Sequence, residues 1–205
     1  MKVLCYISGL PIDPEKRRQS IAERMVSLLQ AYLKYSLSED CFQTGKIELL
    51  KQHYRNILPR SINYCLLLDR LDLCFGLIYD IFSRDPIAHG IYLQCLEPYI
   101  MSNRFEKLAP NVLRDFINFY VENNHFNQLE QCLNRLDMSC LDIEQTVTIT
   151  RKHDLYMTLL HLYSEAFKDF RTILQEIIEK LEDDFIQNGG KLIFLSSDIV
   201  LTMIK

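Results

Sequence analysis

The chain has 205 residues, of which 48% are hydrophobic, and this supplies enough apolar material for one domain with a continuous core. Only 6 Gly and 6 Pro are present, which argues against a disordered chain and against a turn-rich β-sandwich. The net charge is −4, and the 23 basic residues are spread among 27 acidic ones, so the broad basic surface of a nucleic-acid-binding protein is missing. We therefore expect no nucleic acid partner.

Membrane and redox signals point to the cytoplasm. The apolar stretches at residues 3–10 and 192–204 are too short to span a bilayer, and the first is followed by no small-residue cleavage site. An odd number of cysteines without regular spacing predicts reduced thiols that behave as small hydrophobic residues. These are Cys5, Cys41, Cys65, Cys74, Cys95, Cys132 and Cys140.

The first predicted helix begins at Asp13-Pro14-Glu15, where Asp can cap free N–H groups and Pro tolerates the first turn. It should end between Ser36 and Asp40. Apolar residues recur along it at three- and four-residue steps, which predicts one buried stripe and a partner helix. The stripe comprises Ile21, Met25, Leu28, Leu29, Tyr32 and Leu33.

A second helix is predicted from Lys46 to Pro59, where the missing N–H and the ring should break it, and another should start at about Arg60. The polar residues 69–72 then separate that helix from a further one over residues 73–82. The short polar connection predicts that the two form a helical hairpin.

Asp85-Pro86 opens the next predicted helix, which should reach Pro98 and be followed by a loop at residues 101–104. Pro110 opens another, closing at Asn123-Asn124. The remaining expected helices cover residues 126–136, 142–152, 155–167 and 170–186, and the last stops at Asn188-Gly189-Gly190.

These short helices suggest a repeat. Setting Phe126 on Leu155 superposes two helix pairs at an offset of 29 residues and brings Leu133 onto Leu162. Each amphipathic pair exposes an apolar face that only a neighbouring pair can cover, which is the logic of a helical-repeat solenoid. We predict an all-α fold, an α-solenoid of stacked antiparallel helix pairs; a compact irregular helical bundle is the alternative.

The sequence contains no recognisable motif for catalysis or metal binding. The histidines His53, His89, His125, His153 and His161 form no HExxH or Cys/His cluster, and no GxSxG motif occurs. His125 and His153 lie at the helix joints, where capping of a helix C-terminus is the favoured role. We therefore assign no catalytic, cofactor-binding or metal residue and predict that the chain is not an enzyme; an all-helical enzyme with a triad of distant residues is the alternative.

Other polar groups have ordinary explanations. The acidic pairs at Glu182-Asp183-Asp184 and at Asp69 with Asp72 could share a proton or a metal, but charged surface at a helix end and at a turn is the simpler interpretation. Gly189-Gly190 lacks the strand and the glycine spacing that a phosphate-binding loop needs.

Three segments resemble a known family. They are residues 8–18 (SGLPIDPEKRR), residues 62–71 (INYCLLLDRL) and residues 129–145 (LEQCLNRLDMSCLDIEQ), and the likeness continues through His153-Asp154-Leu155-Tyr156. Together they resemble the central region of the vacuolar protein sorting-associated protein 8 family over about residues 8–187. From Ser196 onward the family pattern does not continue, so we expect a helical-repeat segment over residues 1–187 and a divergent tail over residues 188–205.

The resemblance implies a scaffold segment of an endosomal vesicle-tethering subunit, in the complex called CORVET, that acts in protein transport to endosome and vacuole or lysosome. It implies other tethering-complex subunits as partners and peripheral attachment to endosomal membranes through the complex. The family's contact with an early endosomal small GTPase is implied only through parts that have no counterpart in this sequence. A clathrin-like or other sorting-complex solenoid is the alternative within the same class.

Overall fold

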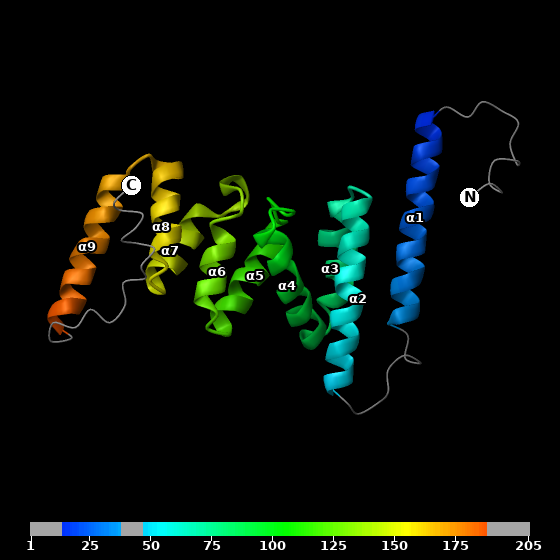
Figure 1. The fold of residues 1–205 in the computed structure, drawn as a ribbon, viewed down its shortest axis with the longest axis horizontal. Helices are drawn as coiled ribbons and strands as arrows, with labels where there is room; N and C mark the ends of the chain where they lie inside the picture. The colour runs from blue at the N-terminus through cyan, green and yellow to red at the C-terminus, as the bar shows by residue number, and fades with distance from the viewer. Residues whose placement is uncertain (1–13, 38–46, 188–205) are drawn as a thin grey trace, which may run out of the picture. The chain divides into compact units, whose positions relative to one another are not determined.

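The computed structural model describes residues 14–37 and 47–187, and within these two ranges the regular structure is helical, with no strand. The chain divides into two compact units, Met1–Tyr92 and Leu93–Lys205, and the boundary falls inside helix α4 (Pro86–Met101). Figure 1 shows the helices in chain order. Each unit is described separately below.

In the first unit, helix α1 (Pro14–Ser36) packs against helix α2 (Ile47–Leu67). The start of α1 agrees with the prediction, although its proposed cap, Asp13, lies outside the described residues. Two hydrogen bonds join the helices: the Tyr64 hydroxyl donates to the carbonyl of Met25 at 3.1 Å, and His53 Nε2 donates to the carbonyl of Ser36 at 2.7 Å. These bonds use carbonyl groups of α1, so they fix how α2 lies along it.

Helix α2 corrects the prediction that Pro59 breaks the chain into two helices, because it runs through Pro59 without interruption. Proline removes one backbone hydrogen bond and its ring crowds the preceding turn, which costs about 3 kcal/mol in a helix interior. Burial offsets this cost, since Leu58 and Ile62 on either side of the proline are both fully buried. Tertiary packing thus overrides the local signal.

The predicted hairpin after α2 is confirmed, since the π-helical turn η2 (Leu73–Ile78) packs back against α2 and continues into helix α3 (Tyr79–Phe82). The Tyr92 hydroxyl donates to the carbonyl of Cys74 at 3.1 Å inside the core. Asp85 caps α4 as expected: its Oδ1 accepts the N–H of Ile87 at 3.0 Å. Its Oδ2 also accepts the hydroxyl of Tyr54, which lies on α2.

After the end of α4, the described part of the second unit contains two helix pairs and a further helix. The first pair is α5 (Pro110–Glu122) with α6 (Phe126–Leu133), and the second is α7 (Ile143–Lys152) with α8 (Tyr156–Leu162), which extends into the π-helical turn η4 (Tyr163–Phe167). Helix α9 (Phe170–Gln187) packs on α8. A 3₁₀ turn, η3 (Met138–Cys140), connects the two pairs.

These bounds agree with the predicted order, with two corrections. Helix α6 ends three residues before the predicted Leu136, and α4 runs through Pro98 to Met101 instead of stopping at the proline. As in α2, buried residues lie beside the proline in α4, here Leu96 and Ile100.

One type of joint recurs at the helix ends. Asp69, Asn103, Asn124 and Asp154 each adopt a left-handed conformation with φ between 54° and 59°. The N–H of the next residue then bonds to the carbonyl five residues before it, as for His125 with Tyr120 and Leu155 with Thr150, both at 2.9 Å. This is the Schellman closure of a helix C-terminus, with Asn or Asp in the position that glycine usually occupies.

The joints correct the predicted repeat offset of 29 residues. Asn124 and Asp154, which occupy equivalent positions in the two pairs, are 30 residues apart, and the helices α6 and α8 begin at Phe126 and Tyr156. At this offset the buried Leu129 corresponds to the buried Leu159. The predicted offset is wrong by one residue, because matching apolar residues alone cannot distinguish two adjacent registers of a weak repeat.

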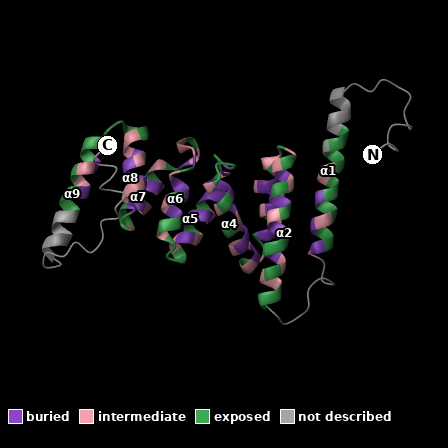
Figure 2. Cartoon of the chain, viewed as in Figure 1, coloured by how far each residue is buried: buried purple, intermediate pink, exposed green. Residues whose placement is uncertain are grey.

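Apolar residues close the core of the second unit around α8. Leu159 and Leu160 pack with Ile173 and Ile177 of α9, and partly buried side chains from α7, η4 and α9 surround them. Figure 2 shows this burial as purple bands on the helices. None of the helices among the described residues is long and apolar enough to cross a membrane.

Candidate interaction surface

The histidines are placed apart and serve packing and capping. His125 is the N-cap residue of α6, and its backbone N–H bonds to the carbonyl of Tyr120 in α5 at 2.9 Å, so it lies at the joint between the two helices as predicted. Capping of the α5 C-terminus by its side chain stays a prediction. His153 does follow the C-terminus of α7, and its ring stacks on Phe126 with centroids 4.5 Å apart. His53 bonds to α1 as described above, and His89 meets Tyr79 edge to face.

The acidic groups of the sequence likewise belong to turns and surface. Asp72 forms an exposed ion pair with Arg70 at 2.7 Å, and Asp69 adopts the left-handed conformation of the joint. Glu182, Asp183 and Asp184 lie in α9, but their side chains fall outside the described part, as do Gly189 and Gly190. Within the described residues, no group of three or more His, Cys, Asp or Glu could hold a metal ion.

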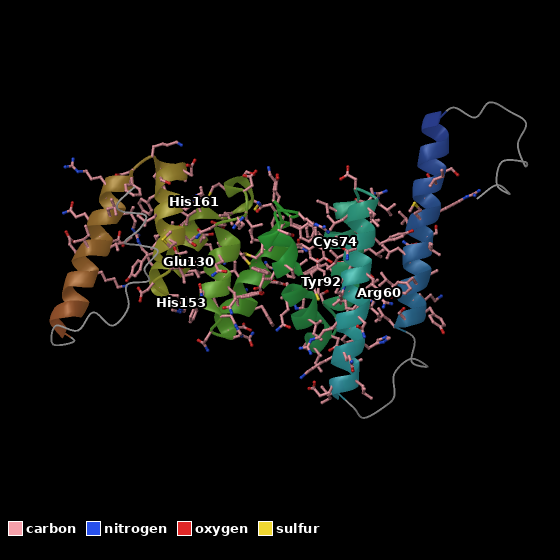
Figure 3. All side chains as sticks on the ribbon, viewed as in Figure 1. Arg60, Cys74, Tyr92, Glu130, His153 and His161 are labelled. Atoms are coloured by element: carbon pink, nitrogen blue, oxygen red, sulfur yellow. The ribbon has the colours of Figure 1, made fainter. Side chains whose placement is uncertain are left out.

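The most informative polar group is Glu130, which links the two helix pairs of the second unit (Figure 3). It lies on α6, and its Oε1 accepts the N–H groups of Met157 at 2.8 Å and Thr158 at 3.3 Å, in the first turn of α8. A carboxylate at this position satisfies free donors and complements the positive end of the helix dipole. Burial raises the pKa of the Glu130 carboxyl, while the two N–H groups act in the opposite direction.

Other polar contacts link neighbouring helices in the same unit. The hydroxyl of Tyr120 on α5 donates to Glu97 Oε2 on α4 at 2.6 Å, and burial together with this bond raises the pKa of Tyr120. Arg151 at the end of α7 pairs with Glu176 of α9 at 2.8 Å. Each contact joins one helix to another, so polar bonds add to the apolar packing between the helices of this unit.

No periodic pattern in the sequence predicts these contacts. A single Glu at position 130 and a single Tyr at position 120 look like ordinary surface and core residues in the sequence. The 30-residue repeat could have indicated that α6 lies beside α8, and so that a polar residue on α6 faces the start of that helix.

Exposed apolar side chains gather on two of the described helical segments, α1 and the region of α9. The α1 stripe consists of Ile21, Leu28 and Tyr35, which are seven residues apart and therefore share one side of the helix. This corrects the prediction of a single buried stripe. Leu29 and Leu33 are buried as expected, whereas Ile21 and Leu28 are 50% and 63% exposed because α2 covers only the adjoining side of α1.

The second surface, the α9 face, consists of Phe167, Phe170 and Ile178. Ile173 and Ile177 of α9 are buried against α8, whereas Phe170 and Ile178, on the adjoining side of the helix, are each 45% exposed. The apolar face of α9 is therefore wider than the surface that α8 covers. Large exposed apolar patches of this type commonly mark interaction sites.

The fold and these surfaces agree with comparisons to known proteins. Residues 91–193, about half of the chain, match a family described as Vps8 central TPR. The chain is 32% identical to the vacuolar protein sorting-associated protein 8 homologs of mouse and human over 90% of its length, and 18% identical to the yeast protein over 88%. It spans only about 13% of the length of the mouse and human relatives. No solved structure matches.

The family match confirms the predicted fold class, an all-α helical-repeat solenoid, and the resemblance on which the functional expectations rest. It covers both helix pairs of the second unit and the whole of α9. The chain belongs to the Vps8 central TPR family.

Proposed function

We propose that this chain is a scaffold segment of a subunit of CORVET, the endosomal vesicle-tethering complex, and acts in protein transport to the endosome and the vacuole or lysosome. The family match supports the proposal, because the relatives are named for vacuolar protein sorting. On this proposal the segment works through protein–protein contacts and carries out no catalysis. Its residues 1–187 serve as the repeat segment.

The observation that carries the proposal is the set of links between successive helices in the second unit. Apolar contacts between α8 and α9 are reinforced by Glu130, which ties α6 to α8, and by Arg151, which ties α7 to α9. A repeat held by contacts between neighbours behaves as a spacer whose length and direction are set by its number of units. Such a segment suits a protein that holds binding modules at a distance.

The partners of the proposed scaffold are other subunits of the tethering complex, and its place is the cytoplasmic side of endosomal membranes, where the complex attaches it peripherally. Contact with an early endosomal small GTPase would use other parts of the full-length relatives. The exposed α1 stripe is the first surface to test, since burying apolar side chains supplies most of the free energy in stable interfaces.

The experiment is a capture assay with the whole chain immobilised and each of the other tethering subunits offered in turn. We expect at least one subunit to bind. We expect Leu28→Glu to weaken its binding roughly 10-fold or more, since replacing a hot-spot residue costs about 2 kcal/mol or more and about 1.4 kcal/mol corresponds to a factor of ten. Gln30→Glu is the matched control, because Gln30 is exposed on the opposite side of the same helix and the substitution adds the same charge.

If no subunit binds a sample whose helical content is intact, the scaffold role is wrong. If both variants weaken binding equally, the effect is one of charge, and the α1 stripe is not the interface. Retained binding by Leu28→Glu would place the contact elsewhere on the segment.

A further inference from the structure

The exposed side of α1 has the apolar spacing of a coiled-coil helix. Ile21, Leu28 and Tyr35, the α1 stripe, recur every seven residues and are 50%, 63% and 75% exposed. Met25 and Tyr32 lie between them and are half-buried, so the apolar steps alternate between four and three residues. A helix with this alternation is ordinarily covered by a second helix of the same spacing.

Helix α2 extends this apolar side. The two hydrogen bonds that join α1 and α2 show that the helices are antiparallel, since residue numbers rise along one helix and fall along the other. Leu67 follows Tyr64, which bonds to Met25, by one turn on the same side of α2. It therefore lies level with Ile21, one turn before Met25 on α1, and it is 83% exposed. Both helices thus present an apolar side chain at this level.

Positive charge borders the apolar side chains. Arg24 lies one turn before Leu28 on α1, Arg60 lies one turn before Tyr64 on α2, and both are exposed (Figure 3). Neither guanidinium forms an ion pair with another of the described residues. Helix α1 contains five Lys or Arg and two Glu, and α2 contains three and one, although the whole chain has a net charge of −4. The pair is therefore basic in an acidic chain.

We propose that the α1–α2 surface, formed by the α1 stripe, Leu67, Arg24 and Arg60, binds an acidic amphipathic helix of a partner protein. The apolar residues of that helix pack on the α1 stripe and Leu67, and its Glu or Asp side chains pair with the two arginines. The stripe extends over 14 residue steps, or about 21 Å, so a partner helix of about four turns covers it. The inference rests on the proposed function, in which the segment works through protein–protein contacts.

Two other occupants fit the surface less well. A second copy of the chain in a two-fold contact would set the same basic surface against itself, which brings like charges together. An anionic lipid surface would attract the two arginines, but it imposes no seven-residue spacing on the apolar side chains, whereas a partner helix does. Spacing and charge together therefore favour an acidic helix.

Two synthetic three-heptad peptides test the proposal by fluorescence anisotropy with the whole chain. Both have Leu at the a and d positions; one has Glu and the other Lys at the flanking e and g positions. We expect the acidic peptide to bind at least ~10-fold more tightly at low ionic strength, with a preference that shrinks as salt screens the charges. Arg60→Glu should weaken its binding about 3-fold or more at physiological ionic strength, and the double variant Arg24→Glu with Arg60→Glu should reverse the preference.

Arg55→Glu is the matched control. Arg55 is exposed on α2 at about 140° around the helix from Arg60, so the same charge change there should leave the affinity within about 2-fold. Circular dichroism on each variant establishes that its helical content is intact. The proposal is overturned if the two peptides bind equally, if Arg55→Glu weakens binding as much as Arg60→Glu, or if the double variant keeps its preference for the acidic peptide.

The same samples distinguish the other occupants. A dimer that Leu28→Glu dissociates would overturn the proposal in favour of a second copy. Binding to vesicles of equimolar phosphatidylcholine and phosphatidylserine that Arg60→Glu abolishes, without discrimination between the peptides, would overturn it in favour of lipid. If the acidic peptide fails while a tethering subunit is captured, this inference is wrong and the proposed function stands. If the peptide binds with the expected charge preference but no subunit is captured, the surface is supported and the scaffold role in that complex is wrong.

Discussion

Replacing Glu130 by alanine should weaken the contact between the two helix pairs of the second unit. The substitution removes the acceptor of two backbone N–H groups, those of Met157 at 2.8 Å and Thr158 at 3.3 Å. A hydrogen bond to a charged group contributes about 1.5–3 kcal/mol, and losing the acceptor at a helix N-terminus costs about 0.5–2 kcal/mol. With one bond short and the other long, we expect the free energy of unfolding to fall by about 2 kcal/mol.

Urea unfolding followed by circular dichroism measures the change, and amide exchange at Met157 and Thr158 shows whether it is local to α8. Gln131→Ala is the control at the neighbouring position, where the exposed side chain bonds only to Asn127 within α6, and it should cost less than about 0.5 kcal/mol. Glu130→Gln keeps one oxygen acceptor without the charge, so its cost should lie between the two.

The pH dependence follows from the raised pKa of Glu130, whose main cause is burial. The folded chain holds the proton to a higher pH than the unfolded chain, in which the Glu130 carboxyl has the ordinary pKa of a glutamate side chain, 4.5. The stabilisation due to this shift is therefore fully present below about pH 4.5 and is lost as the pH rises through the folded value. The free energy of unfolding of wild type, relative to that of Glu130→Gln, should therefore decrease as the pH rises.

Two results would refute this reasoning. If Glu130→Ala costs no more than Gln131→Ala, the carboxylate does not link the helix pairs. If wild type gains stability relative to Glu130→Gln over that pH range, the two N–H groups lower the pKa by more than burial raises it.

Three further predictions concern the helix ends, the proline and the thiols. Asn124→Ala should lower the free energy of unfolding by about 1 kcal/mol, and Asn124→Gly should not lower it, because alanine is strained at φ near 57° whereas glycine and asparagine adopt it more readily. Equal losses in denaturant titrations would contradict this. Pro59→Ala should raise the unfolding free energy by about 1–2 kcal/mol by restoring a helical N–H, and a decrease would mean that the packing around α2 requires the proline. Burial raises the pKa of Cys74 to about 12, so mass spectrometry should find it unmodified by iodoacetamide at pH 8 in the folded chain, whereas the half-buried Cys140 reacts; prompt alkylation of native Cys74 would show that its part of the core opens.

Local sequence determined where most helices begin and end. Pro110 and Asp142 mark helix starts because a proline suits the first turn and an Asp side chain can cap free N–H groups, and Asn124 marks an end because it tolerates the left-handed conformation. These effects depend on a few adjacent residues, so they can be predicted without knowledge of the fold. The family resemblance, carried by short segments, likewise needed no structure.

Tertiary structure decided which helices contact one another and which residues they bury. The continuation of α2 through Pro59 depends on burial of Leu58 and Ile62 by distant residues, which no local pattern contains. The role of Glu130 depends on α8 being its neighbour, and the exposure of Leu28 depends on how far α2 covers α1. Helical periodicity identifies an apolar side, but only the packed neighbours decide how much of that side is buried and how much remains for a partner.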